Sequence, residues 1–161
     1  MQTPDPTTEH HWLQQLVGDW QFVHECSMGP DQPSSKSTGT QSTRALGKFW
    51  TLGEMSVDSS EGSASHSIIT LGFDPMRGKF VGTFVSSCMT YLWLYEGSLD
   101  EAGRVLTLDA EGPSFLGEGA MGQYQDIIEF VDADTYLFSS RIKQADGTWL
   151  SFMSGTFTRK A

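Results

Sequence analysis

The sequence predicts an all-β fold, an antiparallel up-and-down β-barrel of about ten strands with one short N-terminal helix. The 161 residues include 17 glycines, 10 phenylalanines and 5 tryptophans, a composition typical of aromatic-rich strands joined by tight turns. Segments with period-two alternation follow one another through short connections, and only one segment has helical spacing. We favour a closed barrel over a Greek-key sandwich because closure leaves no exposed sheet edge.

The single predicted helix covers residues 9–16, near the N-terminus. Thr8 is a suitable N-cap, Trp12 and Leu16 share one apolar stripe, and Gly18 ends the helix. We expect the apolar stripe to close one end of the sheet.

Strand signals continue from this helix to the end of the sequence. Between two of them, Pro75 suits position two of a type I turn and Gly78 can take the positive φ that closes a hairpin; Asp146 and Gly147 form a second hairpin signal. The predicted strands span residues 20–28, 38–45, 49–57, 67–73, 79–86, 89–97, 104–111, 123–131, 135–144 and 148–159, and the longer loops span residues 29–41, 59–65 and 112–122.

The predicted strand at residues 89–97 has two largely apolar faces. Tyr91, Trp93 and Tyr95 alternate with residues that include Leu92 and Leu94. Such a strand is covered on one side and faces a packed core or an apolar cavity on the other.

Composition bounds the class of protein. We expect one domain over residues 1–161, with Cys26 and Cys88 as free, buried thiols. The formal charge of -10 disfavours nucleic acid and anionic lipid as partners. No apolar segment is long enough to span a bilayer and the first residues do not form a signal peptide, so we expect a cytoplasmic protein.

Parity of the apolar positions selects the side chains that point into the barrel. It directs Asp126 inward from residues 123–131 and Glu54 inward from residues 49–57, whereas Arg141 lies inward only if its strand contains a bulge. A buried carboxylate requires a partner, so Asp126 either belongs to a structural hydrogen-bond network or contacts a ligand.

Large aromatic side chains accompany these polar groups on the predicted inner faces. They form either an ordinary core or the wall of a pocket. The candidate ligand-binding residues are Trp50, Glu54, Phe84, Trp93, Tyr124, Asp126, Arg141 and Met153.

The sequence predicts no metal site, cofactor or catalytic residue. Its four histidines lack the spacing of a zinc motif. Haem with His24 or His66 as its axial ligand is an alternative, but a single histidine among aromatic residues is more often a packed side chain.

Several motifs resemble the bacterial domain-of-unknown-function family DUF1579. They are LVGDW at residues 16–20, LGKFW at 46–50, GFDPMRGKFVGTF at 72–84, MTYLWLYEGSL at 89–99, LTLDAEGP at 106–113 and DGTWLSFMSGTFTRK at 146–160. The resemblance implies a calycin-like β-barrel, the architecture of lipocalins and fatty-acid-binding proteins. It implies no established activity and carries over no catalytic residues, so ligand binding follows from architecture alone.

We therefore predict a protein that binds a small apolar or amphipathic molecule inside its barrel, rather than an enzyme. One alternative is a hydrolase or isomerase with Asp126 or Glu54 as general base. Another is a homodimer formed through outward-facing Tyr91 and Tyr95 and the loop at residues 115–116.

Overall fold

A computed structural model describes residues 1–27, 29, 31–58 and 64–161 and confirms the predicted fold class. The chain forms helix α1 (Thr8–Leu13), a 3-10 turn η1 (Gln14–Leu16) and a closed barrel of ten antiparallel strands. The strands are β1 (Gly18–Cys26), β2 (Ser35–Leu46), β3 (Trp50–Asp58), β4 (Ser65–Asp74), β5 (Lys79–Ser86), β6 (Trp93–Leu99), β7 (Val105–Pro113), β8 (Met121–Asp132), β9 (Thr135–Lys143) and β10 (Trp149–Arg159).

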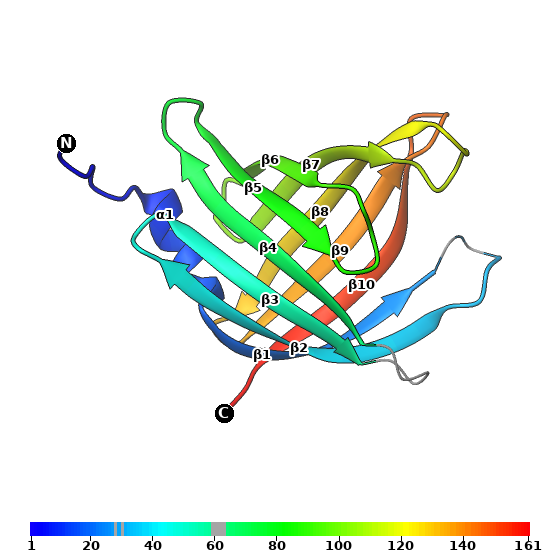
Figure 1. Ribbon diagram of the computed structural model, residues 1–161, viewed down its shortest axis with the longest axis horizontal. Coiled ribbons are helices and arrows are strands. Elements are labelled where there is room, and N and C mark those ends of the chain that lie inside the picture. Colours follow the sequence, from blue (N-terminus) through cyan, green and yellow to red (C-terminus); the bar gives the residue numbers. More distant parts are fainter. Residues whose placement is uncertain (28, 30, 59–63) are drawn as a thin grey trace.

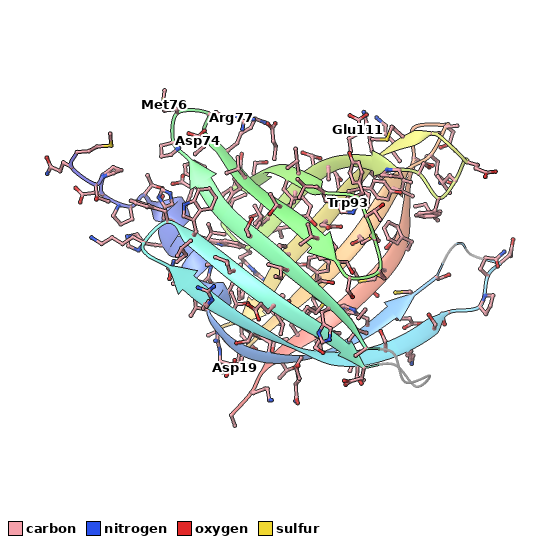
Figure 2. The ribbon with its side chains drawn as sticks, in the orientation of Figure 1. Asp19, Asp74, Met76, Arg77, Trp93 and Glu111 are labelled. Carbon is pink, nitrogen blue, oxygen red and sulfur yellow. The ribbon has the colours of Figure 1, made fainter. Side chains whose placement is uncertain are left out.

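Each strand pairs with its neighbours in the chain, and β1 pairs with β10, where Trp20 lies opposite Arg159. Helix α1 covers one end of the barrel, and the β1–β2 and β7–β8 loops lie at the other end (Figure 1). The turn between β4 and β5 carries Met76 and Arg77 away from the barrel wall (Figure 2). Gly78 closes this hairpin with a φ of 64°, as the sequence predicts.

Apolar packing and one arginine seal the barrel at the α1 end. Leu13 at the end of α1 and Leu16 in η1 are buried against the barrel. The Trp12 indole donates a hydrogen bond to Gly103 O at 2.7 Å. The Arg159 guanidinium lies 4.2 Å from the centroid of the Trp20 ring and donates from Nη1 to Val17 O at 2.8 Å. This end of the barrel is therefore closed, as the apolar stripe of the helix predicts.

Side-chain parity is confirmed on two adjacent strands. Tyr124, Ile128 and Phe130 of β8 are buried, and so are Tyr136 and Ile142 of β9. These strands have the regular alternation of a half-buried sheet, in which the inward residues are also the larger apolar ones.

Strand β3 has the opposite parity to the one predicted. Thr51, at 2% exposure, and Gly53 point inward, whereas Trp50 and Glu54 lie on the exposed outer face. The prediction is wrong because small inward residues leave room inside the barrel, so the more apolar face of this strand is the outer one. Trp50 packs there against Gly72 of β4, where a side chain would overlap its ring.

Strand β6 is shorter than predicted, and its Tyr95 faces the interior, not the outer surface as predicted. It begins at Trp93, so Tyr91 lies in the preceding loop. Tyr95 is 4% exposed and faces the interior, which excludes it from an outer dimer surface. Leu94 of β6 instead occupies the outer face, and Leu92 in the preceding loop is exposed as well.

Other boundaries differ by a few residues. The predicted helix at residues 9–16 ends in the 3-10 turn η1, because the chain tightens before it enters β1. Strand β2 starts at Ser35, within the loop predicted at residues 29–41, because it remains paired with β1 as far as Cys26. Residue 28 of the first predicted strand, residue 30 of that loop and residues 59–63 of the loop predicted at 59–65 lie outside the described residues.

Candidate functional site

The barrel encloses a cavity of about 480 Å³ between its closed end and the opposite loops. Leu16 borders it at the α1 end, and Met89 and Phe115 come from the β5–β6 and β7–β8 loops. The lining is mainly aliphatic and aromatic, with a few polar side chains from β1, β2, β8 and β9. An apolar cavity with a few convergent polar groups is the general form of a small-molecule site.

A connected set of aromatic rings forms one wall of the cavity. The Trp93 and Tyr124 ring centroids are 4.9 Å apart, and Tyr124 contacts Phe152 at 5.9 Å. Phe115 joins this wall through a 5.1 Å contact with Phe152. Phe115 of the glycine-rich β7–β8 loop therefore lies against the cavity, while both it and Leu116 remain exposed to solvent, so the dimer surface predicted at residues 115–116 stays a prediction.

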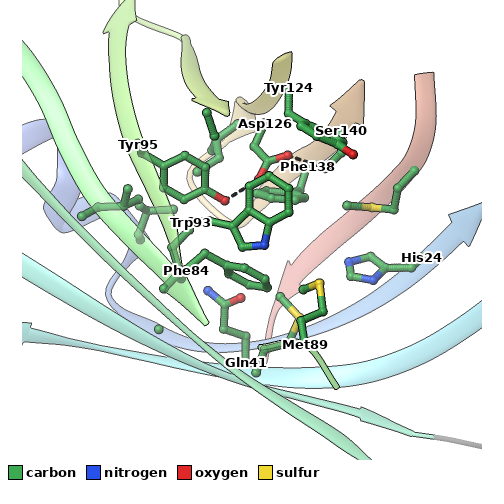
Figure 3. A pocket seen from close by; sticks show the side chains of 18 of the residues that line it. His24, Gln41, Phe84, Met89, Trp93, Tyr95, Tyr124, Asp126, Phe138 and Ser140 are labelled. Atoms are coloured by element: carbon green, nitrogen blue, oxygen red, sulfur yellow. Dashed lines mark hydrogen bonds between the residues drawn. The ribbon is translucent and has the colours of Figure 1, made fainter. Parts of the chain in front are cut away.

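A glycine sets the position of the Trp93 indole. The ring lies against Gly112 of the neighbouring strand β7, where an added Cβ would overlap it. Because Gly112 has no side chain, the indole can lie flat against the strand and extend over the cavity. Figure 3 shows Trp93 between Phe84 and the Asp126 cluster.

Asp126 is the centre of a polar cluster within this apolar lining (Figure 3). Ser140 Oγ donates a hydrogen bond to Asp126 Oδ1 at 2.5 Å, and the Tyr95 hydroxyl donates to Oδ2. Burial raises the pKa of Asp126, while the hydrogen bonds from Ser140 and Tyr95 oppose this rise. Burial and the neighbouring carboxyl raise the pKa of Tyr95, so it remains a hydrogen-bond donor at neutral pH.

Two other polar side chains line the cavity without complete hydrogen bonding. Among the described residues, the buried side-chain nitrogens that lack a hydrogen-bond partner are Gln14 Nε2, His24 Nε2 and Trp93 Nε1. The latter two belong to cavity residues on β1 and β6, which are five strands apart in either direction round the barrel. Burial lowers the pKa of His24 to about 4, so its imidazole is neutral at neutral pH.

The structure brings together five of the eight sequence-predicted site residues and separates the other three. Phe84, Trp93, Tyr124, Asp126 and Met153 line the cavity. Trp50 and Glu54 lie outside it because of the parity of β3. Arg141 also lies outside: the irregularity beside it falls in β10, between Ser151 and Met153, and leaves β9 in register with β8. Arg141 Nε donates to Gln125 Oε1 at 2.8 Å on the outer face.

Sequence reasoning missed several residues of the cavity. The sequence predicts Tyr95 on the outer surface and does not identify Gln41, Phe138 or Phe152 as site residues, although all four line the cavity. Strand alternation from Trp93 could have placed Tyr95 correctly, because residues two apart share a face. The bond between Tyr95 and Asp126 joins β6 and β8 across β7, so it depends on two strand registers.

Residues 1–27, 29, 31–58 and 64–161 contain no group of three or more metal-ligating side chains. Within the same ranges, no helix combines the length and the apolar character required to cross a membrane.

The fold and the cavity define the class of protein: a calycin-like antiparallel β-barrel with an apolar cavity inside it. Within that class the chain belongs to DUF1579, a family described as proteins of unknown function, whose model matches residues 5–159. No curated protein matches the sequence.

Solved structures share the fold at low sequence identity. Rv2717c from M. tuberculosis is 13% identical, with a TM-score of 0.65 over 98% of this chain and 100% of the other. The S-type phycobiliprotein lyase CPES from Guillardia theta is 13% identical, with a TM-score of 0.64 over 97% of this chain and 94% of the other. EF1p2_mFAP2b bound to DFHBI is 13% identical, with a TM-score of 0.50 over 94% of this chain and 98% of the other.

Proposed function

We propose that the protein binds a small apolar or amphipathic molecule inside its barrel. The observation that carries this proposal is the cavity of about 480 Å³, which lies within the range of about 300–1,000 Å³ typical of small-molecule sites. A ligand there exchanges contact with water for contact with aromatic and aliphatic side chains, the main source of affinity for an apolar molecule.

The polar groups of the cavity supply specificity. Trp93 Nε1 and His24 Nε2 have no hydrogen-bond partner among the described residues. A buried polar atom without a partner costs roughly 1–3 kcal/mol, and a ligand atom removes this cost once the side chain turns to bring the nitrogen to the cavity. Trp93 Nε1 can only donate, so it favours an acceptor atom on the ligand.

Barrels of similar fold support the proposal by analogy. EF1p2_mFAP2b is bound to DFHBI, and CPES is a phycobiliprotein lyase. Fold alone does not determine function, so the argument depends on the cavity of this chain.

A cavity-filling substitution tests the proposal. Ala110 of β7 lines the cavity, and Ala110→Phe fills part of it, whereas Ala145→Phe adds the same ring to an exposed turn between β9 and β10. We expect the uncharged dye Nile red to gain fluorescence with the wild-type protein and with Ala145→Phe. Its affinity should fall at least tenfold with Ala110→Phe.

An unchanged affinity in Ala110→Phe, with the fold intact by circular dichroism, would refute binding inside the barrel. The dye would then bind the exposed outer face, which carries Ile68, Val85, Leu92 and Leu94. Native mass spectrometry of the purified protein, followed by extraction under denaturing conditions, identifies any natural ligand that is retained.

The alternative of a hydrolase or isomerase that uses Asp126 as a general base stays a prediction. Both oxygens of Asp126 already accept hydrogen bonds, from Ser140 and Tyr95. Glu54 lies on the exposed face of β3 and cannot serve as a base in the cavity. Since no observation favours turnover, binding is the proposal that we advance.

A further inference from the structure

Asp126 is a carboxyl group without a cationic partner in an apolar cavity. Its two hydrogen-bond donors, Ser140 and Tyr95, are both neutral hydroxyls. Within the part of the chain that the structure describes, no lysine or arginine lines the cavity. Neutral donors compensate only part of the hydration that an ionised carboxylate loses on burial, so a positive charge placed beside it is strongly favoured.

The other titratable side chains of the cavity are uncharged at neutral pH. Burial raises the pKa of Tyr95, Tyr124, Tyr136 and Cys26 and lowers the pKa of His24 to about 4. All five line the same cavity as Asp126. Asp126 is therefore the cavity group that carries charge once it is ionised.

Aromatic rings surround the space next to Asp126. Figure 3 shows the carboxyl group close to Tyr95 and Trp93, with Tyr124 from the same strand at its side. Trp93 and Tyr124 pack edge to face at 4.9 Å, and both side chains line the cavity. Aromatic faces attract cations, and tryptophan does so most strongly.

We infer that the ligand of this cavity is a cationic amphiphile, a protonated amine on an apolar body, whose charge pairs with Asp126. This inference rests on the proposed function, since it names the chemical class of the molecule bound in the same cavity. The ammonium group donates to the free lone pairs of the Asp126 oxygens, and the apolar body occupies the space lined by Phe84 and Met153.

The charge of the whole protein favours the same class of ligand. The formal net charge of -10 attracts cations to the barrel and repels anions. An anionic amphiphile such as a fatty carboxylate would bring a second negative charge next to Asp126, with no lysine or arginine among the described lining residues to pair with it. The cavity therefore selects against this class.

Three ligands of similar shape separate charge from hydrophobicity: naphthalen-2-ylmethylamine, naphthalen-2-ylmethanol and 2-naphthoate, which are cationic, neutral and anionic at neutral pH. Isothermal titration calorimetry with the wild-type protein measures each affinity. A charge-assisted hydrogen bond contributes more than a neutral one, so we expect the amine to bind about tenfold to hundredfold more tightly than the alcohol. The carboxylate should bind most weakly.

Asp126→Asn tests the residue itself, because asparagine retains the shape of the side chain without its charge. Its amide oxygen can accept from one of the two hydroxyls, Ser140 or Tyr95, and its NH2 group can donate to the oxygen of the other. We expect amine affinity to fall at least tenfold and alcohol affinity to change less than threefold. The matched control is Asp109→Asn on β7, which removes an exposed carboxylate on the outer face and should change neither affinity. If Asp126→Asn does not fold, Trp93→Leu should weaken amine binding about threefold more than alcohol binding, through loss of the cation–π contact.

The possible failures are distinguishable. Equal affinity for the amine and the alcohol, tightest binding of the carboxylate, or an amine preference that survives Asp126→Asn would overturn the inference, while binding of Nile red that is sensitive to Ala110→Phe would keep the proposed function intact. Absence of binding by all three compounds and by Nile red would overturn both.

Discussion

Protonation of His24 should couple the stability of the barrel to pH. The side chain is 7% exposed, stacks on Phe22 at 4.2 Å between ring centroids, and lies against Gly155 of β10. Burial lowers its pKa from 6.5 to about 4. Between these two values the unfolded chain binds a proton at this histidine and the folded protein does not, so acidification favours unfolding.

The size of the effect follows from the shift. A lowering of the His24 pKa from 6.5 to about 4 corresponds to about 3 kcal/mol in the free energy of unfolding. Because the ring keeps some contact with solvent, we expect about 2 kcal/mol. This part of the free energy of unfolding is fully present above pH 6.5, the unfolded value, and is lost as the pH falls towards 4, the folded value. Below that value both states bind the proton and the loss is complete.

Urea unfolding at pH 7.5 and pH 4.5, followed by circular dichroism, measures this loss. The matched variant is His24→Phe, which keeps an aromatic ring on Phe22 and cannot titrate. We expect the free energy of unfolding of the wild type to fall by about 2 kcal/mol more than that of the variant between the two pH values. Other carboxyl groups titrate in both proteins, and their contributions cancel in this comparison. Equal pH dependence of the two proteins would refute the assignment.

Three further predictions concern the closed end and the cavity wall. Arg159→Ala should lower the free energy of unfolding, measured by urea unfolding, by about 2–3 kcal/mol. The substitution removes the hydrogen bond to Val17 O and the stacking of the guanidinium on the Trp20 indole. Gly112→Ala should displace the Trp93 ring. This displacement should change the wavelength of maximum tryptophan emission and lower Nile red affinity severalfold. Tyr95→Phe removes a donor from Asp126, so it should raise the pKa of that carboxyl further and destabilise the protein by about 1–2 kcal/mol, more at pH 8 than at pH 5.

Each of these three has a control and a contrary result. Arg141→Ala removes an outer-face arginine and should cost less than about 1 kcal/mol, so equal losses for the two arginines would contradict the role of the closed end. Gly147→Ala changes a glycine in an exposed turn, and unchanged emission in Gly112→Ala would show that the indole does not depend on its glycine. For Tyr95→Phe, equal destabilisation at both pH values would mean that the hydroxyl does not act through the carboxylate.

The sequence predicts most of the fold because local signals agree with the architecture. Pro75 and Gly78 specify one hairpin and Gly147 another, so the order of the strands follows from turns that can be recognised one at a time. Alternation on β8 and β9 then identifies the inward faces, since their inward positions also carry the larger apolar side chains.

The site is only partly predictable, because assigning the inward face of a strand assumes that the larger apolar side chains point inward, and this need not hold beside a cavity. A residue that lines the cavity can be small, as Gly53 is, because larger neighbours such as Gln41 and Ile69 pack over it; a large apolar residue such as Trp50 can then lie on the outside. The inward direction of Asp126 follows from β8 alone, but its bond to Tyr95 depends on how β6, β7 and β8 align. Strand register is a property of the assembled sheet, which local sequence patterns do not reveal.

The pairing of β1 with β10 also has a consequence for how the protein is made. In a nascent chain that has emerged only as far as β9, strand β10 is missing from its place between β1 and β9. The edges of β1 and β9 that β10 covers are therefore both unpaired. The barrel closes only when β10 pairs with β1, from Cys26 with Met153 to Trp20 with Arg159, and this is the strand pairing with the greatest separation along the chain. Until then both edges can pair with another molecule, so synthesis that stalls before β10 produces an aggregation-prone intermediate.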